Sequence, residues 1–527
     1  MSLTSLKFFL FLGITLLLFY SVKKYQKYIL LLGSVIFYLS APGIDVPMIC
    51  LLMIYIIALT HYGAVFIEKA KTERTANIIT FISIAGLSVN LFILKYAFNL
   101  GELFSQLFHL NPNLSWLQFV PVIGLSYFSL SAIGYLIDIR WKLYEAEKDI
   151  TTTALFIFYF PQVISGPVTR FSEIRYQLVT TKTLEVSNIE YGIRRMLWGF
   201  FKKLVISERF ALIVSATYGD PQYGGGDLFI ATLCYAIQLY TDFSGCMDIV
   251  LGASAMFGVK LPENFKSPFF SKTIQEFWQR WHITLGLWFK DYVMYPIQKS
   301  DPMVKIGKTC KLKFGKKVGK KVPFYLSMLF LWILIGMWHG CTAYYFVAAA
   351  VIPCTLIMMS DLLGQISKKV SLLLPLKNSD LLWINLKRLR TFLLICICWV
   401  FVCAGTVSGG MESLFNIITD FSNINTVDVF VSTGRGKGTV ILMVLGLSLL
   451  FFADYLKEKG SSLYEFVSSK PFLIRSGIIY AEIFAILYAG MVGQSQLFIF
   501  NFKNVKKNKF MEGNSHIYSH PFYNCIH

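Results

Sequence analysis

The chain has 527 residues, of which 55% are hydrophobic, 16% aromatic and only 15% charged. A soluble protein of this length carries roughly a quarter charged residues. Here the apolar residues gather in blocks that approach the roughly 20 helical residues needed to cross a bilayer. The composition therefore excludes a soluble globular protein and predicts a multi-pass integral membrane protein.

The net charge of +19 comes from 49 Lys and Arg against 30 Asp and Glu. In a soluble protein this excess would indicate a nucleic-acid partner, but in a polytopic protein Lys and Arg accumulate in cytoplasmic loops. The ten cysteines show no CxxC pair and no metal-ligand spacing. We therefore expect no nucleic acid, no metal site and mostly buried thiols.

Thirteen apolar segments predict an all-α fold with about eleven to thirteen membrane elements. The first is followed by Ser21-Val22-Lys23-Lys24 rather than a small-residue cleavage site, so we expect it to remain as a span. Residues 152–168 contain Pro161, Gly166 and Pro167, which predict a re-entrant or interfacial segment. The thirteen segments are 5–22, 28–41, 45–61, 76–96, 118–139, 152–168, 196–216, 227–252, 323–340, 342–360, 388–408, 437–454 and 474–491.

Basic residues follow the first, third and fifth predicted spans, at 23–27, 69–74 and 140–142. The intervening stretches 42–44 and 97–117 hold almost no Lys or Arg. Because cytoplasmic loops are the basic ones, this pattern predicts an N-terminus outside the cell and these three turns in the cytoplasm.

The strongest basic cluster is 305–321 (KIGKTCKLKFGKKVGKK), with eight lysines and no acid. We expect a cytoplasmic loop that lies against anionic headgroups, although a cluster that only fixes the topology explains it as simply. Apolar sequence ends near Phe502. The sequence thus predicts a membrane domain at 1–502 and a polar, disordered tail at 503–527 without a catalytic role.

Two of the seven histidines lie in the membrane-rich second half, and both follow a tryptophan, as Trp281-His282 and Trp338-His339. His339 lies at the end of an apolar run, where an ionisable group is costly and commonly faces a cavity or pathway. A neutral imidazole with a pKa near 6.5 can take a proton from a hydroxyl. The alternative is a hydrogen-bonded structural histidine at a helix end.

His282 lies in 274–293 (IQEFWQRWHITLGLWFKDYV), which reads as one amphipathic helix. Phe277, Trp281, Leu285 and Trp288 share one face with Tyr292, and His282 lies on the other. This pattern predicts an interfacial helix with its aromatic residues at headgroup depth. An anchor helix with an incidental histidine remains the alternative.

A polar cluster interrupts the apolar run 227–252. Gln238 and Asp242 are four residues apart and share a helix face. Asp242 and Asp248 need partners inside a membrane, so they orient another group, bind a polar substrate or form a polar clamp between helices. The small residues of 124–131 (GLSYFSLS) predict close helix packing.

Several motifs in order resemble the membrane-bound O-acyltransferase family, in particular its bacterial branch that includes the membrane subunit of alginate O-acetylation. The resemblance covers about residues 1–502. The motifs are 123–128 (IGLSYF) with 135–138 (YLID), 160–167 (FPQVISGP), 242–245 (DFSG), 277–284 (FWQRWHIT), 288–292 (WFKDY), 337–340 (MWHG) and 496–502 (QLFIFNF).

The resemblance implies a ring of tilted helices around a thinned centre, with a funnel where an acyl thioester meets its acceptor. It implies that His339 is catalytic and that His282 is the second functional histidine. We expect His339 to accept a hydroxyl proton, His282 to orient or polarise a substrate group and Asp242 to steady the polar network. Four more residues are expected to support the substrates: Trp281, Trp338, Ser244 and Arg280.

The resemblance also implies the reaction. An acetyl or other short acyl group would pass from cytoplasmic acetyl-CoA or another acyl thioester, with no bound cofactor, to a hydroxyl of an extracytoplasmic polysaccharide or cell-wall polymer. An extracytoplasmic acetyltransferase or esterase-like protein commonly completes such a transfer. This places the protein in the cell membrane, beside its donor, its glycan acceptor and that partner.

Two segments depart from the family pattern, namely 293–299 (VMYPIQK), where the family often has Ile-Pro-Leu-Gly-Gly, and the lysine-rich 305–321. One alternative is D-alanyl transfer from a carrier protein to teichoic acid, although that relative is usually shorter. A transporter or flippase for a lipid-linked glycan is the alternative from another class, and it does not require two Trp-His pairs.

Overall fold

A computed structural model describes residues 1–491 except 42–44, 109–121, 165, 219–222, 341, 365–379 and 422–435. The expected tail at 503–527 and the last family motif at 496–502 lie outside the described residues. Across the described ranges the regular structure is helical, and extended backbone pairs at an isolated antiparallel bridge between Phe265 and Trp281. The predicted all-α class is confirmed.

The N-terminal third contains α1 (Leu6–Ser21), the 3₁₀ helix η1 (Lys23–Tyr25), α2 (Gln26–Leu39), α3 (Val46–Lys69), α4 (Glu73–Leu107), α5 (Leu125–Arg140), α6 (Ile150–Phe158), α7 (Phe160–Val163) and α8 (Phe171–Val179). The middle third contains α9 (Val186–Phe200), the π-helix η3 (Phe201–Ser207), α10 (Glu208–Tyr218), α11 (Gly225–Met256), the 3₁₀ helix η4 (Pro268–Phe270), α12 (Ile274–Arg280), α13 (Ile283–Phe289), the π-helix η5 (Lys290–Met294), α14 (Tyr295–Lys299) and α15 (Asp301–His339). The last third contains α16 (Ala343–Phe346), the π-helix η6 (Val347–Val351), α17 (Ile352–Leu362), α19 (Leu381–Ala404), α20 (Val407–Thr419), α22 (Gly436–Glu458), α23 (Leu463–Ser468) and α24 (Phe472–Ala489).

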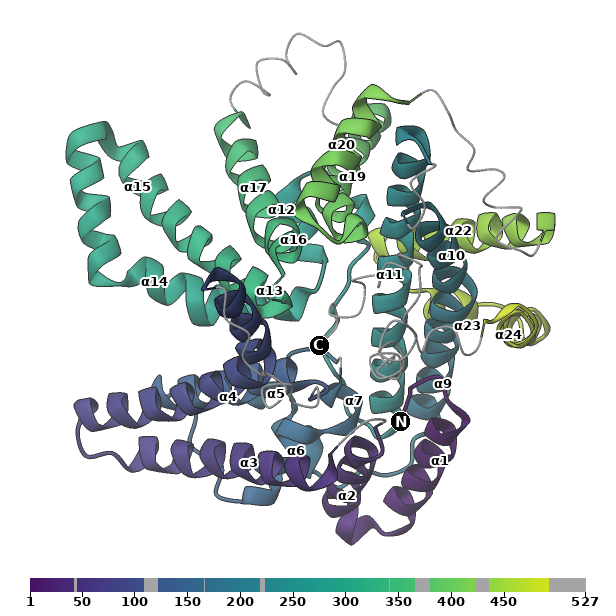
Figure 1. Cartoon of the computed structure of the whole chain (residues 1–527). Helices are drawn as coiled ribbons and strands as arrows, with labels where there is room; N and C mark the ends of the chain where they lie inside the picture. The colour runs from purple at the N-terminus through teal and green to yellow at the C-terminus, as the bar shows by residue number, and fades with distance from the viewer. Residues whose placement is uncertain are drawn as a thin grey trace.

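Many of the long helices lie towards the edge of the molecule, whereas the long helix α11 and the short helices α7, α12, α13 and α16 lie nearer its middle (Figure 1). Side-chain caps fix where several helices begin, because the first N–H groups of a helix have no partner within it. Asp45 accepts from the N–H of Met48 at 3.1 Å at the start of α3, and Thr273 accepts from the N–H of Glu276 at 3.1 Å at the start of α12.

Six of the described helical stretches are long and apolar enough to cross a membrane. α1 and α2 meet at a bend of 112° and count together as a seventh span or as a re-entrant pair. Each of the thirteen predicted segments contains helix, but elements such as α5, with 16 residues, fall short of a 30 Å hydrocarbon layer at 1.5 Å per residue. The six stretches are Val46–Lys69, Glu73–Ala97, Asp301–His339, Ala343–Leu362, Gly438–Glu458 and Phe472–Ala489.

The basic turns predicted to share the cytoplasmic side contact residues close to one another's ends. Lys27 forms an ion pair with Asp149, just beyond the third turn. Arg140 donates to Asn77 at 2.8 Å, next to the second turn. Since these contacts join turns far apart in sequence, the basic residues gather on one face, which the positive-inside rule assigns to the cytoplasm.

α11 runs through the core and packs against α9 through glycines. A Cβ added at Gly199 would lie 2.6 Å from the carbonyl oxygen of Gly245, and a Cβ at Gly252 would lie 2.6 Å from that of Gly192. Small residues at such positions let membrane helices approach closely. Gly245 belongs to the 242–245 motif, so this motif includes a helix-packing surface.

The prediction of one interfacial helix over 274–293 is wrong. The chain breaks at His282, which has φ 48°, so that α12 ends before it and α13 begins after it. Phe277, Leu285 and Trp288 are buried in the protein rather than placed at headgroup depth. The bridge from Phe265 to Trp281 holds the break, and no local periodicity reports such a long-range contact.

The predicted loop at 305–321 is also wrong, because these residues are helical and belong to α15. α15 reverses direction at Gly315, whose φ of 85° departs from helical geometry. Lysine is a good helix former, and the stretch contains few residues other than glycine that disfavour helix.

Candidate active site

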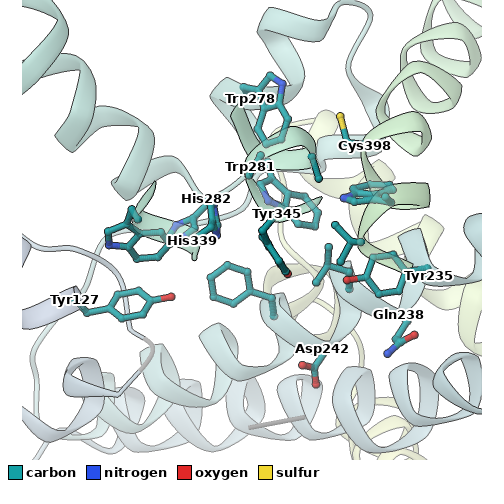
Figure 2. A pocket seen from close by; sticks show the side chains of 17 residues that line it. Tyr127, Tyr235, Gln238, Asp242, Trp278, Trp281, His282, His339, Tyr345 and Cys398 are labelled. Carbon is teal, nitrogen blue, oxygen red and sulfur yellow. The ribbon is translucent and has the colours of Figure 1, made fainter. Parts of the chain in front are cut away.

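The two Trp-His pairs, separated by more than fifty residues, line one cavity of about 120 Å³. Figure 2 shows His282 and His339 close together, with the hydroxyl of Tyr127 directed towards the same space and Asp242 on the α11 side. A cavity needs only about 10–15 Å³ by this measure to hold one water, so there is room for a small substrate group. We call this space the outer cavity.

A second cavity of about 300 Å³, the inner cavity, shares His282 and His339 with the first. Its lining includes Lys290 of η5. In the same π-helix the Tyr292 hydroxyl donates to Asp138 at 2.8 Å, close to the basic turn at 140–142. The inner cavity therefore lies on the side of the histidines nearer this basic turn.

The outer cavity lies further towards the opposite face. Gln238 and Asp242, which line it as their shared helix face predicted, stand midway along α11. The C-terminal end of α11 lies on the side of the basic turns, since the hydroxyl of Tyr20 donates to the carbonyl oxygen of Met256 at 2.7 Å just before the first basic turn. The two histidines thus lie between cavities on opposite sides.

The conformation of His282 is set by Asn264. Asn264 Oδ1 accepts from the backbone N–H of Thr284 at 3.0 Å and from its hydroxyl at 2.9 Å. A backbone N–H can only donate, so the atom facing it is the amide oxygen. The same oxygen lies 3.3 Å from His282 Nδ1, which must carry the hydrogen in this contact.

The neutral imidazole of His282 therefore has its lone pair on Nε2. Nε2 is buried and without a hydrogen-bond partner among the described residues. The backbone at His282 is left-handed, with a φ of 48°. His282 is consequently prepared to accept a hydrogen bond or a proton and, in this tautomer, cannot donate to a substrate oxygen from Nε2.

Three further unpartnered polar atoms belong to side chains of the outer cavity. Within the described part of the chain these are the indole N–H groups of Trp278 and Trp338 and the amide oxygen of Gln238. Buried polar groups are nearly always hydrogen-bonded, and an orphan costs about 1–3 kcal/mol. Two donors and two acceptors, counting His282 Nε2, thus belong to side chains that line the outer cavity and are available to a polar ligand.

Trp338 connects the aromatic groups of the site. Its ring centroid lies 5.4 Å from that of Tyr127, 5.8 Å from His282 and 4.8 Å from His339, each in an edge-to-face arrangement. His339 also stacks on Tyr345 at 6.2 Å. These contacts fix the end of α15, so the Trp-His-Gly motif is held as a unit.

Lys95 of α4 donates to the carbonyl oxygen of Trp338 and lies 5.5 Å from its ring. A cation at the C-terminal end of a helix stabilises the carbonyl groups there. Lys95 also lies 3.4 Å from the hydroxyl of Ser126. Lys95 is therefore a positioning residue for His339.

Buried ion pairs join η3 to α11. Lys203 pairs with Asp242 at the edge of the outer cavity, and Lys202 pairs with Asp248 at 2.7 Å and donates to Ser244 at 2.8 Å. Asp242 thus lines the cavity, where it can contact a polar substrate, and its pairing with Lys203 is also part of a polar clamp between two helices. Ser244 lines neither cavity and contributes to the clamp between the helices.

Among the expected support residues, Trp281 lines both cavities and Trp338 lines the outer one. Arg280 lines neither and instead pairs with Glu458 of α22 and with Glu276 at 2.7 Å. Sequence reasoning missed Asn264, Lys95 and the part that Tyr127 takes in the cavity. Tyr127 stood in a quoted motif and Lys95 is a charged residue inside the predicted span 76–96, whereas Asn264 carried no local signal.

Comparison with known proteins supplies the identity. The model of the MBOAT, membrane-bound O-acyltransferase, family matches residues 147–303, which include Asn264 and His282. The chain is 31% identical over 349 residues to the probable alginate O-acetylase AlgI of Pseudomonas putida, covering 65% of this chain and 67% of that protein. The chain belongs to the membrane-bound O-acyltransferase family.

This acyltransferase has other relatives. It is 29% identical over 470 residues to the probable alginate O-acetylase AlgI of Pseudomonas aeruginosa, covering 85% of this chain and 81% of that protein. It is 25% identical over 414 residues to the teichoic acid D-alanyltransferase of Bacillus subtilis, covering 76% of this chain and 96% of that protein. Family membership and the candidate spans make it a multi-pass acyltransferase of the cell membrane that uses an acyl donor.

Proposed function

We propose that the acyltransferase passes an acetyl or other short acyl group from a cytoplasmic thioester, with acetyl-CoA as the simplest donor, to a hydroxyl of an extracytoplasmic polysaccharide or cell-wall polymer. The observation that carries the proposal is the position of His282 and His339 between two cavities on opposite sides. A donor in the inner cavity and an acceptor in the outer cavity meet at the histidines. The similarity to two alginate O-acetylases favours acetyl and polysaccharide.

In the proposed reaction His339 takes the proton of the acceptor hydroxyl as its oxygen attacks the thioester carbonyl carbon. A carbon–oxygen bond forms, the carbon–sulfur bond breaks, and the leaving thiolate receives the proton from His339. The products are an ester and a free thiol, so the step is balanced without a cofactor. A positioned base contributes about 10²–10⁴ in rate, and holding both substrates in place contributes more.

The other histidine has a different role in this proposal. His282 Nε2 accepts a hydrogen bond from a second donor on a substrate, such as a neighbouring sugar hydroxyl or an amide N–H of the donor. Negative charge develops on the thioester oxygen, and the buried indole N–H of Trp338 is the donor proposed for it. Asp242, held by Lys203, carries the acceptor side of the polar network.

The immediate acceptor is either the glycan itself or a hydroxyl of an extracytoplasmic acetyltransferase or esterase-like partner that carries the acyl group onward. The outer cavity is small, which favours a group presented at the end of a chain over an internal sugar of a folded polymer. The two routes differ in whether the purified acyltransferase alone labels a glycan.

The test is transfer of label from radioactive acetyl-CoA in membranes that contain the wild-type protein or single variants. His339→Ala should abolish transfer, whereas Trp338→Phe, which removes the indole N–H and keeps an aromatic ring, should lower kcat more than it raises KM. Size-exclusion profiles and thermal unfolding show that each variant is folded. Near-normal transfer by folded His339→Ala would refute the assignment.

D-Alanyl transfer to teichoic acid is the second candidate, favoured by the similarity to the Bacillus subtilis enzyme. The alignment covers nearly all of that protein but only 76% of this chain, so the relative is shorter, as expected. Labelled D-alanyl carrier protein, supplied in place of acetyl-CoA, separates the two candidates. A glycan flippase would instead move its substrate across vesicles without any thioester.

A further inference from the structure

The first part of α15 and the beginning of its second part form a helical hairpin, residues 301–321, which we call the lysine hairpin. Figure 1 shows its arms projecting from the edge of the molecule. The turn is Gly315, whose φ of 85° lies in the left-handed region that glycine adopts readily. The arms approach closely, because a Cβ at Gly319 would lie 2.6 Å from Cβ of Lys311.

The second glycine contact lies nearer the base of the hairpin, where a Cβ at Gly307 would lie 3.2 Å from the carbonyl oxygen of Gly319. The arms therefore meet through glycines, and their long side chains turn outward. All of the eight lysines except Lys321 are exposed, and no acid lies between 305 and 321. Lys321, at the base, pairs with Asp361 of α17.

The tip of the lysine hairpin is apolar as well as basic. Leu312 and Phe314, directly before the turn, are 87% and 67% exposed. Large apolar side chains with this exposure at the end of a projecting element are unfavourable in water. Alternation with Lys311, Lys313 and Lys316 gives a composition suited to the boundary between headgroups and acyl chains.

The reach of the lysine hairpin limits what it can contact. Its second arm continues without interruption into the apolar residues 322–339 of α15. Residues 316–321 extend the helix by at most about 9 Å at 1.5 Å per residue. The headgroup layer on each side of a bilayer is roughly 5–8 Å thick. The tip therefore stays within or immediately beside the headgroups of the cytoplasmic leaflet.

We propose that the lysine hairpin is a lipid-binding element that inserts Leu312 and Phe314 into the cytoplasmic leaflet and places its lysines on anionic headgroups. Three features favour anionic lipid as the binding partner: the positive charge of the hairpin, its exposed apolar tip and its short reach. Basic residues near an anionic leaflet each contribute about 1 kcal/mol, or about fivefold, to binding. The hairpin thus fixes α15, and with it the end that carries His339, relative to the membrane surface.

The test uses protein in nanodiscs, with Leu312→Cys labelled by an environment-sensitive fluorophore in a parent that carries Cys50→Ser, Cys310→Ser and Cys525→Ser. Quenching by lipids with a nitroxide near the headgroup reports insertion. The labelled parent without Leu312→Cys gives the background. We expect strong quenching in bilayers with about one third phosphatidylglycerol, and a matched variant with Lys308, Lys311, Lys313 and Lys316 changed to Gln should lower the inserted-to-free ratio by on the order of 10²–10³-fold.

Absence of quenching in the anionic bilayer would overturn the proposal. Equal quenching in purely zwitterionic bilayers, unaffected by the four Lys→Gln changes, would refute the part assigned to the lysines. A further arm adds an acidic acyl-carrier protein to protein in zwitterionic nanodiscs. Protection of the fluorophore there, without quenching in the anionic bilayer, would assign the hairpin to a protein partner instead.

Discussion

Replacement of Asn264 by leucine should lower the catalytic rate while the protein remains folded. Asn264 is buried, and its single oxygen accepts from Thr284 twice and from His282 once. Leucine fills a similar volume and accepts nothing. The Thr284 hydroxyl can rotate, but its backbone N–H cannot, so at least one donor is left without an acceptor, at a cost of about 1–3 kcal/mol.

His282 responds in a different way from Thr284. Without an acceptor for Nδ1–H, the imidazole can carry its hydrogen on Nε2 instead. This tautomer has no unpartnered N–H at Nδ1, but it lacks the lone pair on Nε2. We expect Asn264→Leu to lower kcat on the order of 10–10²-fold, the size seen when the group that orients a functional imidazole is removed. Asn264→Asp keeps oxygen acceptors at the same place and should retain more activity than Asn264→Leu.

The assay is acetyl transfer by purified protein, with thermal unfolding measured in parallel. A double-mutant cycle with His282→Ala isolates the coupling, since neighbouring residues that act together are not additive. In the His282→Ala background Asn264→Leu should cause little further loss of kcat. Full additivity of the two changes, or unchanged activity of folded Asn264→Leu, would refute the inferred tautomer.

Three other changes have expected outcomes. Lys203→Met leaves the carboxylate of Asp242 buried without its counter-ion and should lower the free energy of unfolding by about 3–5 kcal/mol in a denaturant titration. Gly199→Ala should lower the unfolding temperature more than Gly477→Ala, because a Cβ at Gly199 would lie 2.6 Å from the carbonyl oxygen of Gly245, whereas no side chain or neighbouring segment of the described chain lies within 4 Å of a Cβ at Gly477. Equal effects of the two changes would contradict the packing described. Burial disfavours the charged form of Asp149, but hydrogen bonds from Lys27 and Thr151 outweigh it and lower its pKa to about 2. Its stabilising contribution is thus complete above its ordinary pKa of 3.8 and is lost as the pH falls towards 2, a loss that Asp149→Asn should remove from the acid-unfolding profile.

The sequence was most informative where a residue type is costly in its surroundings. His339 at the end of an apolar run, and Asp242 within another, indicated a cavity, and both line one. The order of the motifs around Trp281-His282 and Trp338-His339 indicated the family, which the comparisons confirm. Membrane insertion followed from composition alone.

The sequence was least informative where long-range contacts decide the local structure. The period of 274–293 fits a continuous helix, yet the bridge from Phe265 and the contacts of Asn264 hold a break at His282. The spacing of apolar residues along a helix gives no information about a contact with Asn264, 18 residues before His282. The hairpin in α15 was missed because a run of lysines reads as a loop by charge, although lysine disfavours helix little.

The central claim is that an acyl group crosses from the inner to the outer cavity past His339. The most direct measurement supplies labelled acetyl-CoA to one side of sealed proteoliposomes that contain the purified protein and an acceptor glycan or partner protein on the other side. The account predicts label on the acceptor only when the donor is on the side of the basic turns, and none with His339→Ala. Transfer from either side, or label on the acceptor with folded His339→Ala, would contradict it.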